Sequence, residues 1–175
     1  MLEARSIVKS FDKIKGILES ENALYKGEYI IHDIIYSSKD RTKTLIDEFL
    51  RLRFVQKNIW NEKEVVVAIK KTEVKTVGKN SIVPLKKQFD SVEEAQKYIN
   101  ENLLNRFEPS FEFSRTGWQY DIRGDQVDLE NIEGIYSIEV KSESEEGLKK
   151  LANTFEMEDV LKGPSVLKVK ELLKR

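Results

Sequence analysis

The chain has 175 residues, of which 30 are Lys or Arg and 31 are Asp or Glu, so its formal net charge is −1. This balance argues against bulk nucleic-acid binding, which usually requires a basic excess. There is no cysteine, which excludes a disulfide framework, a thiolate metal site and a cysteine nucleophile. No run of about 20 apolar residues could span a bilayer, and the first residues lack an apolar signal core. We therefore expect a cytoplasmic protein with neither a membrane nor a nucleic-acid partner.

The first half of the chain is predicted to hold a strand, a helix and then several strands. Alternation predicts a strand at residues 2–8, and an apolar stripe from Phe11 to Leu18 predicts a helix capped by Ser10. Pro84 in the last strand of this half indicates an edge or a bulge. Strand-forming residues and turn residues predict the following elements: strands at 25–36, 49–55, 65–71 and 82–89, with a polar loop at 37–44, a turn region at 58–64 and a loop at 75–80.

The second half is predicted to begin with a helix and to end with helices. Ser91, with Glu94 three residues later, has the capping-box pattern and predicts a helix at 92–105. Gly124-Asp125 predicts a tight turn in a meander of strands. The other predicted elements are strands at 111–115, 118–122, 126–132 and 135–142, then a helical segment from about residue 144, with helices at 144–155, 158–161 and, after Gly163-Pro164, 165–174. We expect a single domain over residues 1–175.

Charge alternates with apolar residues on several of these strands. A period of two sends Arg51 and Arg53 to one face and Leu50 and Leu52 to the other. The same alternation recurs in two further segments: Leu2-Glu3-Ala4-Arg5 and Ile138-Glu139-Val140-Lys141. Because a buried charge is costly unless it meets an opposite charge, strands with a charged face favour a closed barrel. Its interior would be wet, basic and suited to an anion.

These segments resemble the motifs of the CYTH family, also called triphosphate tunnel metalloenzymes. That family has a Glu-x-Glu-x-Lys first strand, an Arg-x-Arg strand, a Lys-bearing strand and a late Glu-x-Glu strand. The matching segments are, in chain order, Met1-Leu2-Glu3-Ala4-Arg5, Leu50-Arg51-Leu52-Arg53, Val67-Ala68-Ile69-Lys70, Phe113-Ser114-Arg115 and Glu139-Val140-Lys141. The resemblance runs from residue 1 to about residue 160. It implies an α+β fold, an antiparallel β-barrel (tunnel) with helices packed outside.

The resemblance also implies a function, namely binding of a triphosphate-containing small molecule inside the tunnel. The implied phosphate-binding residues are Arg5, Arg51, Arg53, Lys70 and Arg115, and the implied ligands of Mg²⁺ or Mn²⁺ are Glu3 and Glu139. The implied activity is that of a divalent-metal-dependent triphosphatase or class IV adenylyl cyclase, acting on a nucleoside, thiamine or inorganic triphosphate. No catalytic residue is assigned, and a homodimer is compatible with the sequence.

Two other interpretations remain open. Family carboxylates are missing at four positions: Met1, Lys86, Gln88 and Lys141. Only one family cation is missing, at Phe113. Because the carboxylates are mostly lost and the cations mostly kept, the chain could instead be a catalytically impaired tunnel-fold module that binds nucleotide or polyphosphate. In the third interpretation the charged faces are ordinary solvated surface. His32, the single histidine, is expected to be structural because no catalytic partner is evident.

Overall fold

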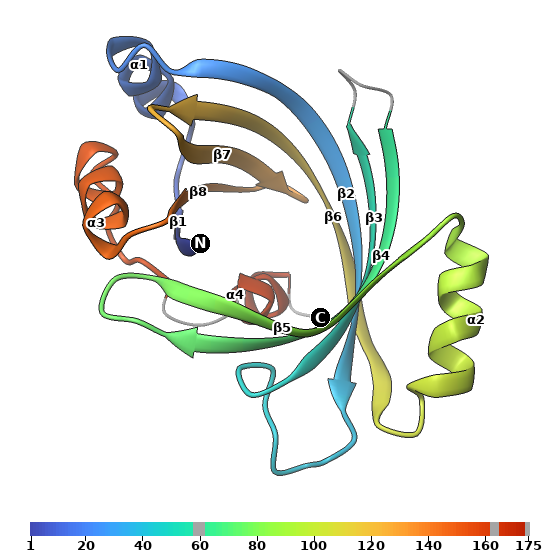
Figure 1. Ribbon diagram of the computed structural model, residues 1–175. Helices are drawn as coiled ribbons and strands as arrows, with labels where there is room; N and C mark the ends of the chain where they lie inside the picture. The colour runs from blue at the N-terminus through green and yellow to red at the C-terminus, as the bar shows by residue number, and fades with distance from the viewer. Residues whose placement is uncertain (58–61, 162–164, 174–175) are drawn as a thin grey trace.

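The structure, a computed structural model, describes residues 1–57, 62–161 and 165–173, and these residues form a closed antiparallel β-barrel (Figure 1). Eight strands close it in the order β1-β5-β4-β3-β2-β6-β7-β8, with β8 paired back to β1. The strands are β1 (Leu2–Ile7), β2 (Leu24–Ser38), β3 (Phe49–Lys57), β4 (Glu62–Val74), β5 (Lys79–Phe89), β6 (Phe107–Ile122), β7 (Asp125–Ile132) and β8 (Ile135–Ser142). The predicted α+β barrel is therefore confirmed.

Three helices pack on the outer wall of the barrel (Figure 1). They are α1 (Asp12–Ser20), α2 (Val92–Asn102) and α3 (Glu145–Thr154). The stripe of α1 and residues of α3 meet the outward side chains of β1, β7 and β8, whereas α2 covers those of β3 and β4. Leu50 and Leu52 lie in the core beneath α2, so Arg51, which lies between them in the strand, must face the barrel interior.

The fourth helix, α4 (Ser165–Leu172), covers one end of the barrel interior. Its Val166 and Val169 pack against apolar residues that point inward from four strands: Ile35, Phe49, Phe113 and Ile132. Leu161 lies beside β1, where its backbone nitrogen donates to the Arg5 carbonyl oxygen at 2.8 Å. β1 pairs with β5 at two positions only, Leu2 with Asn80 and Glu3 with Lys79, so the bond from Leu161 adds a backbone contact to β1 beyond that short ladder.

Several local predictions are confirmed. Ser91 caps α2, because its Oγ accepts from the backbone nitrogen of Glu94 at 3.1 Å. The pairing of β4 with β5 shifts register between Ile69 and Lys71, opposite Pro84, as expected for a bulge. No helix within the described ranges is long and apolar enough to cross a membrane.

Other local predictions are wrong. Residues 111–115 and 118–122 belong to one strand, β6, because Gly117 does not break it; a side chain there would collide with the Tyr29 ring. The turn between β6 and β7 is formed by Arg123 and Gly124, both at positive φ, one residue before the predicted turn.

The remaining errors concern helix ends. Phe11, rather than Ser10, is the N-cap of α1, and residues 158–161 are irregular instead of helical, with Asp159 at positive φ. The predicted break at Gly163-Pro164 and part of the predicted turn at 58–64 lie outside the described residues.

Candidate functional site

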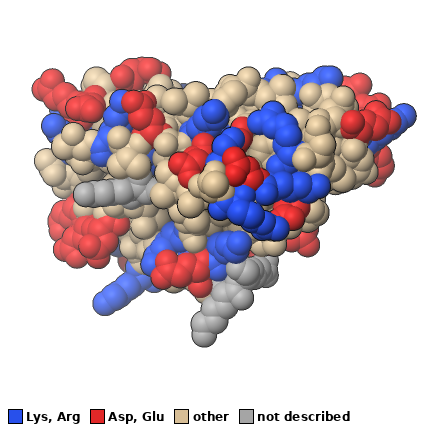
Figure 2. Space-filling model, turned by 90° about the horizontal axis from the view of Figure 1, so that it is seen from below, with Lys and Arg blue, Asp and Glu red and all other residues tan. Residues whose placement is uncertain are grey.

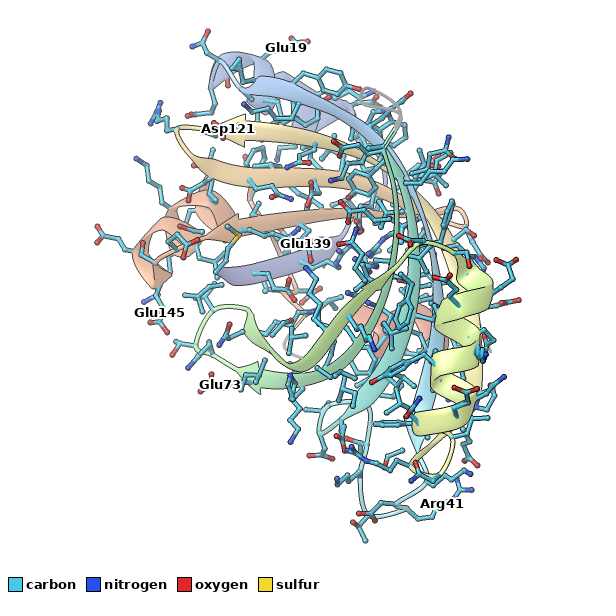
Figure 3. The ribbon with its side chains drawn as sticks, turned by 45° about the vertical axis from the view of Figure 1, so that its right-hand side comes forward. Glu19, Arg41, Glu73, Asp121, Glu139 and Glu145 are labelled. Carbon is cyan, nitrogen blue, oxygen red and sulfur yellow. The ribbon has the colours of Figure 1, made fainter. Side chains whose placement is uncertain are left out.

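The barrel encloses a cavity of about 350 Å³. Its wall is built from the inward side chains of all eight strands, and Val166 of α4 contributes at one end. All seven residues assigned from the motifs line this cavity: Glu3, Arg5, Arg51, Arg53, Lys70, Arg115 and Glu139. Figure 3 shows Glu139 in the interior of the molecule, whereas Arg41 and Glu145 lie at its periphery.

The charges lining the cavity are unequal. Nine cations line it, Arg5, Arg51, Arg53, Lys57, Lys70, Lys79, Lys86, Arg115 and Lys141, against six carboxylates, Glu3, Asp33, Glu64, Asp128, Glu130 and Glu139. Figure 2 shows Lys and Arg side chains gathered around a smaller group of carboxylates on one face of the molecule. An excess of three positive charges in a confined space creates a strong local potential for an anion.

One side of the cavity is electrically balanced. Three cations, Arg5, Arg115 and Lys141, face three carboxylates, Asp128, Glu130 and Glu139, and we call these six residues the balanced cluster. The register explains the pairing, since Asp128, Glu139 and Arg5 stand in one row across β7, β8 and β1.

Arg5 is the centre of this cluster. It is 2 % exposed, bonds to Glu130, and lies 3.0 Å from Glu139 through Nη2 and Oε1. Arg115 Nη1 contacts the same Glu130 carboxylate at 3.3 Å, and Tyr29 donates to its other oxygen at 2.7 Å. Burial alone would raise the pKa of Glu130, but Arg115 and Arg5 hold it below its usual value.

Lys141 joins the other two carboxylates of the balanced cluster. Its Nζ lies 2.8 Å from Asp128 Oδ2 and 3.0 Å from Glu139 Oε2. Burial opposes the charge on Lys141, yet Glu139 and Asp128 raise its pKa above the usual value. Both oxygens of Glu139 therefore meet a cation, Arg5 on one side and Lys141 on the other.

The opposite side of the cavity is strongly basic. Four cations project into the cavity from β3, β4 and β5, namely Arg51, Arg53, Lys70 and Lys86, and together with Asp33 we call them the basic cluster. Arg51 and Arg53 contact the Asp33 carboxylate, which Arg115 also approaches at 3.5 Å. Arg53 forms a bidentate ion pair with Asp33, in which Nε and Nη2 each donate to a carboxylate oxygen at 2.7 Å. Burial alone would raise the pKa of Asp33, but Arg53 and Arg51 hold it well below its usual range.

Arg51 and Lys70 are the least compensated of these cations. Arg51 Nε is 3.8 Å from Asp33 Oδ1 and has no hydrogen-bond partner, although it is buried. Burial, followed by the neighbouring Arg53, lowers the pKa of Arg51 to about 9. Burial, followed by Arg51, lowers the pKa of Lys70 to about 7. Across β3, β4 and β5, Arg51 and Lys86 flank Ala68, the residue with the smallest side chain of the three.

The predicted metal ligands do not form a divalent-metal site in this arrangement. Glu139 is bound on both oxygens, and Glu3 Oε1 accepts from Ser81 at 3.0 Å and lies 3.4 Å from Lys79 Nζ. Within the described ranges, no three Asp, Glu or His side chains come together as a potential metal site. A divalent cation would therefore meet carboxylates whose charge the ammonium and guanidinium groups already neutralise.

Sequence reasoning missed Asp128 and Glu130. Both lie on β7 in the segment Gln126-Val127-Asp128-Leu129-Glu130, whose alternation matches that of the segments that were singled out. His32 faces outward, where its Nδ1 lies 2.9 Å from Ser114 Oγ, so it takes no part in the cavity.

Comparisons with known proteins find similarity in three dimensions only. No family model matches the chain, and no curated protein matches its sequence. The PH1819 protein of Pyrococcus horikoshii aligns with a TM-score of 0.76 at 19% identity, over 99% of both chains. HpAC1 from Hippeastrum, a candidate adenylyl cyclase with a dominant triphosphatase activity, aligns with a TM-score of 0.63 at 14% identity, over 88% of this chain and 85% of its own.

A candidate adenylate cyclase from Vibrio parahaemolyticus aligns with a TM-score of 0.65 at 16% identity, over 99% of this chain and 97% of its own. At such identities the comparison establishes the fold and leaves the chemistry to the residues. Together with the closed eight-stranded barrel, these alignments show that the chain has the tunnel fold of the CYTH proteins.

Proposed function

We propose that the chain binds a triphosphate-containing small molecule, a nucleoside, thiamine or inorganic triphosphate, inside the barrel. The observation that carries the proposal is the basic cluster, in which four cations line the cavity and Asp33, bonded to Arg53, is the one carboxylate among them. A buried cation without a counter-ion is costly, and an anion removes that cost. Burial first, and a neighbouring arginine second, depress the pKa values of Arg51 and Lys70, and a bound anion would offset both effects.

The two clusters suggest different roles for the five predicted phosphate-binding residues. Arg51, Arg53 and Lys70 would contact phosphate oxygens directly, since a guanidinium binds phosphate in a two-pronged manner and a lysine acts as a point charge. Arg5 and Arg115 use their terminal nitrogens on carboxylates, but the buried Nε of each has no partner. These two arginines would therefore add to the potential and offer one donor each.

Calorimetric titration with tripolyphosphate tests the proposal. We expect saturable binding by the wild-type protein, and a loss of about 10- to 150-fold in affinity for Arg51→Met or Lys70→Met, the range for a hydrogen bond to a charged group. Arg41→Met is the matched control, because Arg41 lies on the surface and pairs with Glu108. Absence of binding, or equal affinity in all four proteins, would refute the proposed site.

A second candidate function is hydrolysis or cyclisation of the bound triphosphate. The triphosphatase activity of the similarly folded HpAC1 favours it, as does the presence of Glu3 and Glu139 in the same cavity. It ranks second because both carboxylates are tied to cations. Incubation of the protein with tripolyphosphate, thiamine triphosphate or ATP and with Mg²⁺ or Mn²⁺ tests it, and release of neither phosphate nor cyclic nucleotide would exclude it.

A further inference from the structure

We propose that the ammonium group of Lys141 is a built-in cation that takes the place of a divalent metal on the balanced side of the cavity, so that the protein binds its anion without one. The role of Lys141 as a built-in cation concerns the protein alone. The binding of an anion without a metal rests on the proposed function.

The geometry around Lys141 is that of a cation site filled from within. Its Nζ lies between two carboxylates that belong to neighbouring strands, at 2.8 Å from Asp128 and 3.0 Å from Glu139. Asp128 and Glu139 are directly opposite each other in the β7–β8 ladder, so the backbone holds their carboxylates close together. Two carboxylates held at close range would bind a divalent cation well if the space between them were free.

The other oxygens of this pair are also restricted. Glu139 Oε1 faces Arg5 at 3.0 Å, and Asp128 Oδ2 also accepts from Gln126 Nε2 at 2.7 Å. Asp128 Oδ1 is the one carboxylate oxygen that is buried without a partner in the part of the chain that the structure describes. A metal ion would thus find one available oxygen rather than a set of ligands.

The charge count leads to the same conclusion. Three cations already neutralise the three carboxylates of the balanced cluster, so a divalent ion would enter a neutral environment beside two guanidinium groups. Repulsion from Arg5, Arg115 and Lys141 would oppose its entry. The positive charge that a metal would bring to a triphosphate is supplied instead by side chains, chiefly those of the basic cluster.

The removal of Lys141 should therefore create a metal site. We would measure Mn²⁺ binding by electron paramagnetic resonance, without any anion, in the wild type, Lys141→Met, Lys141→Glu and the control Lys13→Met, whose lysine is exposed and pairs with Glu156. We expect no stoichiometric binding by the wild type or the control. One Mn²⁺ per chain should bind to Lys141→Glu and to Lys141→Met, because both substitutions free the carboxylates of Asp128 and Glu139 from the ammonium group.

Stoichiometric Mn²⁺ binding by the wild type would overturn the inference, as would folded Lys141 variants that gain none. A second measurement needs no variant: tripolyphosphate is titrated into the wild type in EDTA and in excess Mn²⁺. Equal affinities support the inference, and binding that requires Mn²⁺ contradicts it. If tripolyphosphate binds under neither condition, the proposed function fails, and the Mn²⁺ measurement still decides the role of Lys141.

Discussion

Arg5 and Arg51 offer a direct comparison, because both are arginines on strands of the same barrel and both line the same cavity. Arg5→Met removes a buried cation from Glu130 and Glu139, which are 2 % and 8 % exposed. Breaking a buried ion pair from one side typically costs about 3–5 kcal/mol, because it leaves an uncompensated charge. For a chain of this length that corresponds to a fall in Tm of about 6–20 °C.

Arg51→Met should have the opposite profile. Arg51 Nε has no hydrogen-bond partner, and burial with Arg53 nearby depresses its pKa, so its charge already destabilises the folded state. We expect the free energy of unfolding to stay the same or to rise, while the affinity for tripolyphosphate falls by about 10- to 150-fold. Urea denaturation followed by circular dichroism, paired with calorimetric titration, separates the two effects. Equal loss of stability in both variants would refute the division of the cavity into a balanced and a basic cluster.

Three further predictions concern the pH dependence, the end helix and the space within the cavity. Lys70 has a pKa of about 7 and an anion requires its charged form, so affinity should fall as the pH rises above 7. At pH 8, calorimetry in buffers of different ionisation enthalpy should detect proton uptake when tripolyphosphate binds, and Lys70→Arg should abolish this uptake. Equal uptake in the variant would show that Lys70 is not the group that takes up the proton. Val169 is 2 % exposed, so Val169→Asp would bury a carboxylate at a cost of several kcal/mol. Hydrogen exchange in α4 should therefore accelerate, and unchanged protection would count against the docking of α4 on the barrel. Ala68→Leu should fill the space between Arg51 and Lys86, at a cost of about 1–3 kcal/mol in stability. It should weaken tripolyphosphate binding while Ala68→Ser does not, and normal affinity in the leucine variant would exclude an anion from that space.

The faces of the strands could be predicted from the sequence because strand periodicity is local. The alternation at residues 50–53 placed Arg51 and Arg53 inside the barrel, and the same reasoning placed Arg5 and Glu139 there. Gly117 shows the limit of this reasoning, since the predicted strands 111–115 and 118–122 left it out of the sheet. Its actual role depends on Tyr29 of the neighbouring strand, which no local pattern contains.

The division of labour among the cations could not be predicted. Arg5 and Arg51 have equivalent local patterns. They differ because barrel register brings Glu130 and Glu139 into contact with Arg5, whereas the nearest contact of Arg51 is with Asp33 at 3.8 Å, a carboxylate already bonded to Arg53. Likewise, Lys141 in the sequence indicated a lost carboxylate. In the structure it pairs with Asp128, a residue that the sequence interpretation had not singled out.

The pairing of β1 with β8 has a consequence for how the protein folds. Along one edge of β1, residues 2–7 pair with residues 137–142, so this edge cannot form its hydrogen bonds until most of the chain has been made. Contacts of such long range are slow to form because loop closure precedes any stabilisation. During synthesis, Arg5 would remain solvated until Glu130 and Glu139 emerge, and its burial would be among the last events of folding. Barrel closure and burial of this ion cluster should therefore occur together, late and cooperatively.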